Sequence, residues 1–353
     1  QAARILGLNK VSTGEIVEAL LAEGLILETG KLLTSNGRRP TALALAKESR
    51  SLLAIDIAPK ATSFALADLS GTLLRFERTP NSIEGETPEE ALSRLIKGCR
   101  RLLAFSKDKE QAPIGLAVSL AGTIDEDGSL VSIPTLGWNN VPLAGLLKTH
   151  LGCEVILVPR VSAMVGGEKW FSTVFDAPSV YYVNWDDTID SAWVLSGETA
   201  SRGMHISSLL TSSGTLSDTA SGMAISRRAH NVLGGEELTI RQLLQKMPDT
   251  PALENIVEHA CSSMGDALVA ISCVTGCDKL VLGGALSTIS DNLFDSIQER
   301  YQAASPQARA SVSIVRSPLA DKAALMGAVA AVLDQFLFRR TMLEQLDRQE
   351  NRS

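Results

Sequence analysis

The sequence lacks several features that are typical of other classes of protein. No apolar run is long enough to span a bilayer, and no secretory signal segment is recognisable. The 5 cysteines are scattered and odd in number, so they indicate a reducing compartment and no disulfide framework. Basic residues are not in excess, since the net charge is −7, and any DNA contact must therefore come from a local patch. We expect a cytoplasmic protein whose 353 residues form two or three domains.

A local basic patch does occur near the start, where residues 7–45 have the pattern of a helix-turn-helix with a wing. Asn9 can cap a helix over residues 10–23, Gly24 can end it, and strands are expected at 25–28 and 41–45. Such a helix can enter the major groove while a basic hairpin contacts phosphates or the minor groove. The candidate DNA contacts are Lys10, Ser12, Thr13, Arg38 and Arg39.

Two features weaken or limit this prediction. Glu15 lies one turn into the presumed recognition helix, and its charge should reduce non-specific affinity for DNA. Only a few residues precede the first turn, so we expect the domain, residues 1–46, to be incomplete at its N-terminus.

The remainder of the chain alternates strands and helices, and its second half repeats the plan of the first. After a polar hinge at 46–50, the sequence predicts one lobe over 51–158 and a second over 159–337. A charged helical tail is expected over 338–353. Alternation of this kind predicts an α/β fold with two layered lobes.

Segments spread over the whole body resemble the ROK family, which joins repressors and sugar kinases. The matching segments are IDIAPKATSFALADLSG, GLAVSLAGTIDEDGSLV, LGWNNVPL, EVILVPRVSAMVGGE, KLVLGGAL and ADKAALMGAVAAV, with a GRRP wing before them. The resemblance implies a winged helix-turn-helix head on a two-lobed actin-like, sugar-kinase-like ATPase fold. It also implies a homodimer or homotetramer and leaves room for a small-molecule effector.

The motifs that the resemblance assigns to kinase chemistry are degenerate in this sequence. Both glycines of the first phosphate loop are absent from residues 56–62, where a proline also removes an N–H donor. The second phosphate loop, at 186–190, holds three aspartates, which should repel a polyphosphate. These aspartates lack a calcium-loop spacing, so a solvated acidic turn is favoured over a cation site. Arg160 stands where the family has its catalytic Asp, and a guanidinium cannot accept a proton at pH 7. No catalytic residue is therefore expected.

The family's zinc and sugar motifs are also altered. His205 remains, but each cysteine that would complete a zinc site is replaced, so no metal and no other cofactor are expected. The residues that could still line an effector pocket are Gly137, Trp138, Asn139, Glu168 and His205.

Together these observations predict a transcriptional regulator, a repressor of carbohydrate or related metabolism, that binds a double-stranded DNA operator and no membrane. Its ROK body would be catalytically inactive and would act as an effector and oligomerisation module. Two alternatives remain open at this point: an ATP-dependent sugar kinase, and a pseudo-kinase that acts through a protein partner.

Overall fold

The structure of the chain is a computed structural model. This structure describes residues 3–4, 7, 9–31, 41–81, 86–106, 112–128, 130–133, 136–201, 205–234, 237–304 and 312–339. Arg38, Arg39 and residues 340–353 of the expected tail lie outside these ranges. No helix in the described ranges has both the length and the apolar character needed to cross a membrane.

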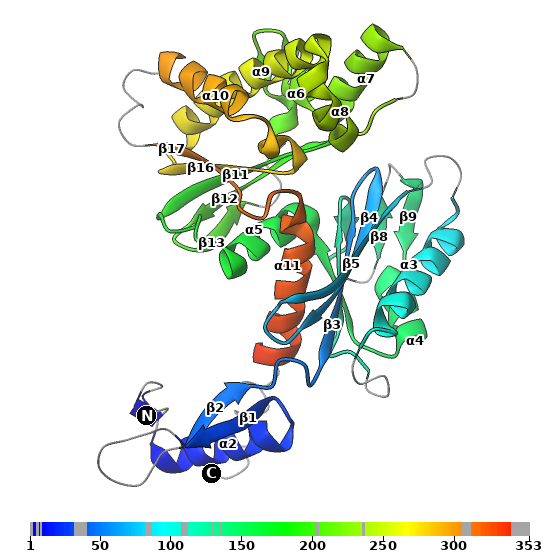
Figure 1. The fold of residues 1–353 in the computed structure, drawn as a ribbon, viewed down its shortest axis with the longest axis vertical. Coiled ribbons are helices and arrows are strands. Elements are labelled where there is room, and N and C mark those ends of the chain that lie inside the picture. The colour runs from blue at the N-terminus through cyan, green and yellow to red at the C-terminus, as the bar shows by residue number, and fades with distance from the viewer. Residues whose placement is uncertain are drawn as a thin grey trace.

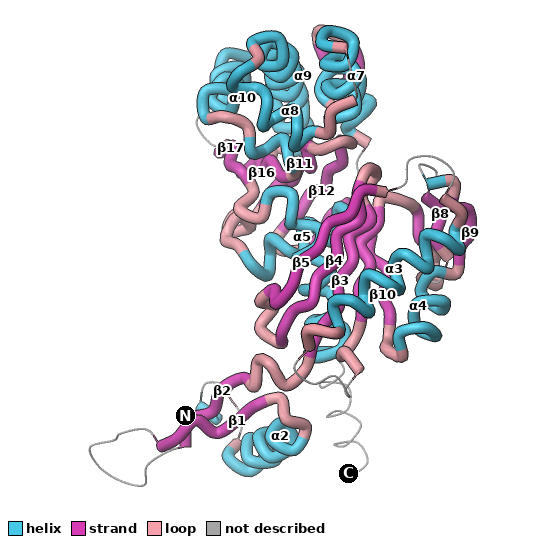
Figure 2. The backbone as a smooth tube through the Cα atoms, turned by 45° about the vertical axis from the view of Figure 1, so that its right-hand side comes forward, coloured by secondary structure: helices cyan, strands magenta, loops and turns pink. Residues whose placement is uncertain are grey.

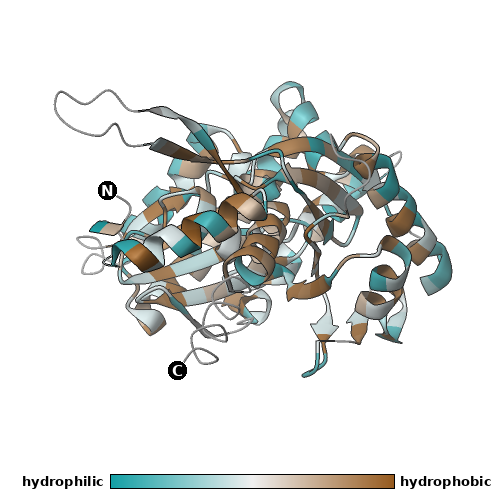
Figure 3. Ribbon diagram, turned by 90° about the horizontal axis from the view of Figure 1, so that it is seen from below, coloured by the Kyte–Doolittle hydropathy of each residue, from teal (hydrophilic) through white to brown (hydrophobic). Residues whose placement is uncertain are grey.

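The N-terminal head is one helix followed by a two-stranded antiparallel sheet, as the sequence pattern predicts. Its elements are α2 (Lys10–Ala22), β1 (Ile26–Lys31) and β2 (Thr41–Leu45). The Asn9 side chain caps α2 by accepting from the Ser12 N–H at 2.8 Å. Gly24 follows the helix with φ +69°, a conformation that favours glycine. The head lies below both lobes in two views (Figures 1 and 2), and α2 mixes hydrophilic and hydrophobic residues along its length (Figure 3).

The first lobe is built on a five-stranded sheet of order β10-β6-β3-β4-β5. Its strands are β3 (Ser51–Ile57), β4 (Ala61–Asp68), β5 (Leu73–Pro80), β6 (Leu116–Leu120) and β10 (Val155–Pro159). Strands β3, β4 and β5 form an antiparallel meander, while β6 and β10 run parallel to β3. Helices α3 (Pro88–Leu103) and α4 (Leu143–Leu151) share a hydrophobic core with this sheet. A small sheet of β7 (Thr123–Ile124), β8 (Val131–Ile133) and β9 (Trp138–Val141) lies beside it.

The second lobe repeats this plan, with the strand order β13-β12-β11-β16-β17. Three strands again form a meander and two more run parallel to the first of them. The strands are β11 (Ser179–Trp185), β12 (Ile189–Leu195), β13 (Glu198–Ser201), β16 (Lys279–Gly283) and β17 (Ser313–Arg316). The covering helices are α6 (Leu216–Ala220), α7 (Gly222–Leu233), α8 (Ile240–Lys246), α9 (Pro251–Thr275) and α10 (Asp291–Ala304). They enclose the largest hydrophobic cluster of the described residues.

Two helices, α5 (Arg160–Phe171) and α11 (Ala323–Val332), cross between the lobes (Figure 1). The sequence pattern placed α11 in the second lobe, but in the structure the helix packs against both sheets. Ala323 and Ala324 join a hydrophobic cluster with Val180 and Val281 of the second sheet. Leu325 and Val329 of α11 pack against Leu52 and Ala54 of the first sheet, and Leu25 of the head joins the same cluster. Because α11 is apolar on all sides, it needs neighbours on all sides, and its sequence does not say which lobe supplies them.

Close contact between α5 and α11 depends on small residues. A Cβ atom built on Gly167 of α5 would lie 2.5 Å from the Ala323 oxygen and 2.7 Å from the Gly327 nitrogen. A Cβ atom on the preceding residue, Gly166, would meet nothing within 4 Å. These adjacent glycines therefore form a matched pair for testing the helix contact.

We expect Gly167→Ala to lower the free energy of unfolding by about 1–3 kcal/mol, because the added methyl group overpacks a backbone contact. Gly166→Ala should instead raise it by up to about 1 kcal/mol, since alanine is the better helix former. Urea unfolding followed by circular dichroism measures both changes. Equal effects of the two substitutions would contradict the assigned helix contact.

Candidate functional site at the lobe junction

Charged and polar side chains gather where the parallel strands of the first sheet end. Asp56 near the end of β3 lies opposite Ser119 of β6 in the strand register. Arg160 follows β10 directly as the first residue of α5. Since β10, β6 and β3 are neighbours and parallel, their carboxyl ends share one edge of the sheet. This edge faces the second lobe (Figure 1).

Asp56 and Arg160 form a buried ion pair at this edge. The Arg160 Nε donates to Asp56 Oδ1 at 3.0 Å, and Ser119 Oγ donates to the same oxygen at 3.0 Å. The two charged residues are only 2% and 5% exposed. Burial acts to lower the pKa of Arg160, but the charge of Asp56, followed by that of Asp186, raises it above its ordinary value. Arg160 thus remains cationic and cannot serve as a proton acceptor.

The turn that joins β3 to β4 is closed by internal hydrogen bonds. The Ala58 N–H donates to the Ala61 carbonyl at 3.0 Å. Asn81 Nδ2 donates to the carbonyls of Ala58, at 2.7 Å, and Pro59, at 3.2 Å. The Asn81 N–H donates to the Lys60 carbonyl. Asn81, which directly follows β5, therefore holds this turn closed. The turn does not form an open glycine-rich loop that could bind a phosphate.

The sequence predicts a solvated acidic turn between β11 and β12, and this prediction is wrong. Asp186 and Asp187 are each 8% exposed, because the N-terminus of α7 covers them. The Gly222 and Met223 N–H groups donate to the carbonyls of Asp186 and Asp187. Burial, together with the charge of Asp186, raises the pKa of Asp187 to about 6. Its Oδ1 atom has no hydrogen-bond partner among the described residues.

The five expected effector residues do not converge on one pocket. Trp138 is 3% exposed and belongs to the core of the first lobe, whereas Gly137 and Asn139 beside it are exposed. His205 is exposed on the second lobe, before the short helix η2 (Ile206–Ser208).

Glu168 is the clearest departure from that expectation. It is fully buried on α5, and its Oε1 accepts from Ser317 Oγ and from the Leu319 N–H. The carboxylate therefore anchors α5 to the 317–319 turn of the second lobe through Oε1, while its Oε2 atom is buried with no hydrogen-bond partner among the described residues.

The head also corrects one expected DNA contact. Lys10 is exposed at the first position of α2, and Ser12 is half-buried. Thr13 is only 8% exposed, and its hydroxyl donates to the Asn9 carbonyl at 2.7 Å. Thr13 thus stabilises the start of the helix and does not belong to the exposed face.

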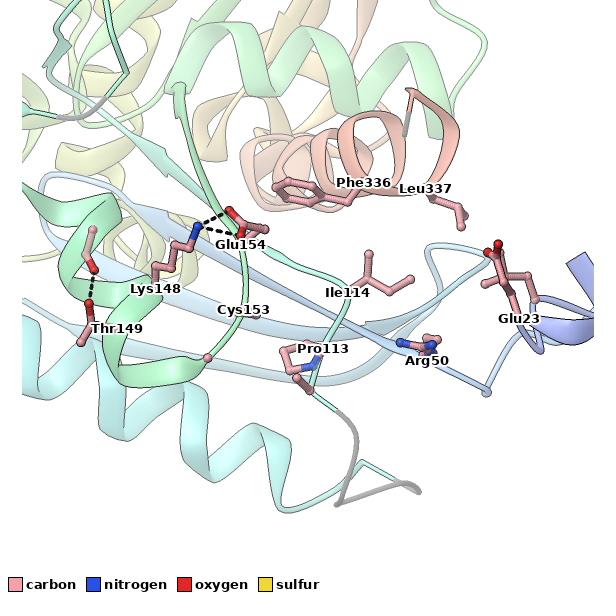
Figure 4. Close-up of a pocket in the computed structure, with 14 residues that line it drawn as sticks. Glu23, Arg50, Pro113, Ile114, Lys148, Thr149, Cys153, Glu154, Phe336 and Leu337 are labelled. Atoms are coloured by element: carbon pink, nitrogen blue, oxygen red, sulfur yellow. Dashed lines mark hydrogen bonds and ion pairs between the residues drawn. The ribbon is translucent and has the colours of Figure 1, made fainter. Parts of the chain in front are cut away.

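A groove of about 1050 Å³ separates the head from the base of the first lobe (Figure 4). Glu23 and Leu25 of the head line one side, and Ile114 and Phe336 of the body line another. Lys148 and Glu154 form an ion pair of 2.7 Å at the far end (Figure 4). None of the expected effector residues lines this groove.

Within the described ranges, no three His, Cys, Asp or Glu side chains are grouped so that they could hold a metal ion. Sequence reasoning did not anticipate the Asp56–Arg160 pair. The available signal was a charged residue at the carboxyl end of each of two apolar strands, at 51–57 and 154–158. If both strands are paired in parallel with the strand between them (β6), Asp56 and Arg160 are expected at the same edge of the sheet.

Two similar five-stranded sheets, with helices crossing between them, define the two-lobed sugar-kinase-like class of α/β proteins. The sequence model of the ROK family matches residues 52–188 and 211–335. The chain belongs to the ROK family.

Curated relatives of this chain are gene regulators. A xylose repressor of Caldicellulosiruptor bescii is 27% identical over 170 residues, which cover 48% of this chain and 42% of the repressor. A transcriptional regulator of Mycobacterium bovis is 26% identical over 321 residues, which cover 82% of this chain and 71% of the regulator. The chain spans about half the length of the xylose repressors that it matches.

Solved structures agree on the fold. The crystal structure of a ROK family transcriptional regulator, a homolog of the E. coli MLC protein, superposes with a TM-score of 0.73 and 19% identity. It covers 94% of this chain and 90% of the regulator. A ROK family glucokinase from Streptomyces griseus, in complex with glucose and AMPPNP, gives a TM-score of 0.67 and 15% identity. That match covers 80% of this chain and 98% of the glucokinase.

Removing one partner of the buried pair should destabilise the protein strongly. We expect Arg160→Met to lower the free energy of unfolding by about 3–5 kcal/mol, because Asp56 is left buried without its cation. The double variant with Asp56→Asn should recover part of this loss, since the remaining group is neutral. Denaturant unfolding of the two single variants and the double variant measures the coupling. Additive losses would show that the pair does not interact as described.

The raised pKa of Asp187 predicts a pH-dependent penalty. Between pH 4 and 6 the Asp187 carboxyl group binds its proton more tightly in the folded protein than in the unfolded chain. The free energy of unfolding therefore falls as the pH rises through this range, and the loss is complete above about pH 6. Asp187→Asn should therefore stabilise the protein by about 1–3 kcal/mol at pH 7 and by little at pH 4. Urea midpoints of both proteins at the two pH values test this. A gain independent of pH would contradict it.

Proposed function

We propose that this chain is a DNA-binding transcriptional regulator, acting as a repressor of carbohydrate or related metabolism, with a catalytically inactive ROK body. The observation that carries the proposal is the buried Arg160–Asp56 pair. The resemblance of residues 154–168 to the family implies that Arg160 stands at the position of the catalytic aspartate, and its guanidinium donates a hydrogen bond to Asp56. General base catalysis contributes roughly 10²–10⁴-fold to such reactions, and this residue cannot provide it.

The charges at the lobe junction also oppose nucleotide binding. Among the described residues that interact there, carboxylates outnumber cations, and each cation already faces a carboxylate. The carboxylates are those of Asp56, Asp186, Asp187, Asp190, Glu237 and Asp321, and the cations are Lys60, Arg78, Arg160 and Arg241. A polyphosphate entering this junction would be repelled.

The head supports a role in binding DNA. Its capped helix begins with the exposed Lys10 and leads into a hairpin, which is the arrangement of a winged helix. The match to the ROK regulator covers 94% of this chain, whereas the match to the glucokinase covers 80%. We assign Lys10, Ser12, Arg38 and Arg39 as the DNA-contact candidates.

In this proposal the body is an effector and oligomerisation module. A homodimer or homotetramer would place two heads at the spacing of a two-fold operator. A small-molecule effector that favours one angle between the lobes would then change the affinity for DNA by linkage. Gly137, Asn139 and His205 remain candidates for contacting such an effector.

The proposal is tested with the full chain and the DNA upstream of its own gene. Wild-type protein should form a sequence-preferring complex that weakens as salt increases, measured by fluorescence anisotropy. Lys10→Ala should reduce affinity for all sequences and lower the slope of log K against log [salt] by about 1, because one phosphate contact is lost.

Lys97→Ala provides the matched control, since Lys97 is an exposed lysine on α3 of the body. It should leave both the affinity and the salt slope unchanged. Equal losses in the two variants, or no sequence-preferring complex with the wild type, would overturn the proposal. An assay of ADP release with hexoses and amino sugars separates this function from that of a sugar kinase, because turnover would require a base that we do not assign.

A further inference from the structure

Charged side chains also join the two lobes, in addition to the packed contact between α5 and α11. Lys60, in the β3–β4 turn of the first lobe, donates through Nζ to Glu237 Oε1 at 3.2 Å. Glu237 precedes α8 of the second lobe. The lysine side chain is only 21% exposed, so part of this pair is removed from water.

A second contact lies at the end of β5. Arg78 Nη1 is 3.7 Å from Asp321 Oδ2, and Asp321 belongs to the short helix η6 (Ala320–Lys322), after the last strand of the second lobe. The same carboxylate pairs with Arg241 of α8. Asp321 thus receives one arginine from each lobe.

The third contact is the buried one already described. Arg160 joins Asp56 of the first sheet and approaches Asp186 of the second lobe, with Nη2 at 3.7 Å from Oδ2. These contacts start from one edge of the first sheet, because the end of β3, the end of β5 and the start of α5 lie there.

The contacts show charge complementarity between the lobes. Lys60 and Arg78 are cations on the first lobe, and the groups they face on the second lobe, Glu237 and Asp321, are carboxylates. Partly buried pairs are screened by salt less than exposed pairs are. The α5–α11 contact is packed backbone against backbone and could act as a pivot, and a rotation of the lobes about it would change the distances within these pairs.

We infer that Lys60–Glu237, Arg78–Asp321 and Arg160–Asp186 together form an ionic latch that holds the two lobes in one closed arrangement. The angle between the lobes is then set by charge pairing across the junction. A group that competes for Lys60 or Arg78 releases the latch. This inference does not depend on DNA binding and is tested without DNA.

The experiment measures the distance between the lobes by double electron–electron resonance. Spin labels are attached at Lys97→Cys on α3 and Arg227→Cys on α7, both exposed, in a Cys273→Ser background that removes the exposed native thiol. The wild-type background should give one narrow distance distribution. The charge reversals K60E and R78E should broaden it and shift it to longer distances, and raising NaCl from about 0.05 M to 1 M should act in the same direction.

The swapped pair K60E with E237K should restore the narrow distribution, because the attraction is rebuilt with opposite signs. K148E is the matched control, since Lys148 pairs with Glu154 within the first lobe and the change in charge is the same. It should leave the distribution unchanged. Thermal unfolding confirms that each variant is folded. The inference is overturned if folded K60E and R78E keep the wild-type distribution, if K148E shifts it equally, or if the swap fails to restore it.

Discussion

The interaction on which the junction depends is the buried contact between Arg160 and Asp56. Two charges removed from water are costly unless they compensate each other, and here Ser119 and Asp186 complete the arrangement. The pair fixes the first residue of α5 against the edge of the first sheet. It also places the Arg160 guanidinium between Asp56 of the first sheet and Asp186 of the second lobe. A carboxylate at position 160 would stand beside Asp56 and Asp186 and would reverse the local electrostatics.

The architecture relates this arrangement to gene control. The two lobes are built on the same plan, and the ROK family model matches segments of both. The head is attached to the same core through Leu25, which packs with residues of α11 and the first sheet. A change in the position of α11 would therefore alter the hydrophobic cluster that contains Leu25 of the head. The residues that make this connection are hydrophobic and include none of the charged residues of the lobe junction.

Much of the fold could be predicted from the sequence, because apolar runs and capping residues are local signals. The strand at 51–57 and the helix after Asn9 were found in this way. The direction of a helical side chain depends on its neighbours in space, and for this reason the roles of Thr13 and Glu168 could not be predicted. The burial of Asp186 and Asp187 depends on the distant start of α7, which no spacing within the turn reveals.

The position of α11 has a consequence for how the chain folds during synthesis. The first sheet leaves the ribosome long before residues 323–332, which cover one of its faces. Until then Leu52 and Ala54 lack their contacts with Leu325 and Val329, and the nascent first lobe exposes part of an apolar surface. The core of the lobe nearest the N-terminus is thus completed only after almost the whole body has been made. Premature termination before residue 323 would leave this surface open to chaperones or to aggregation.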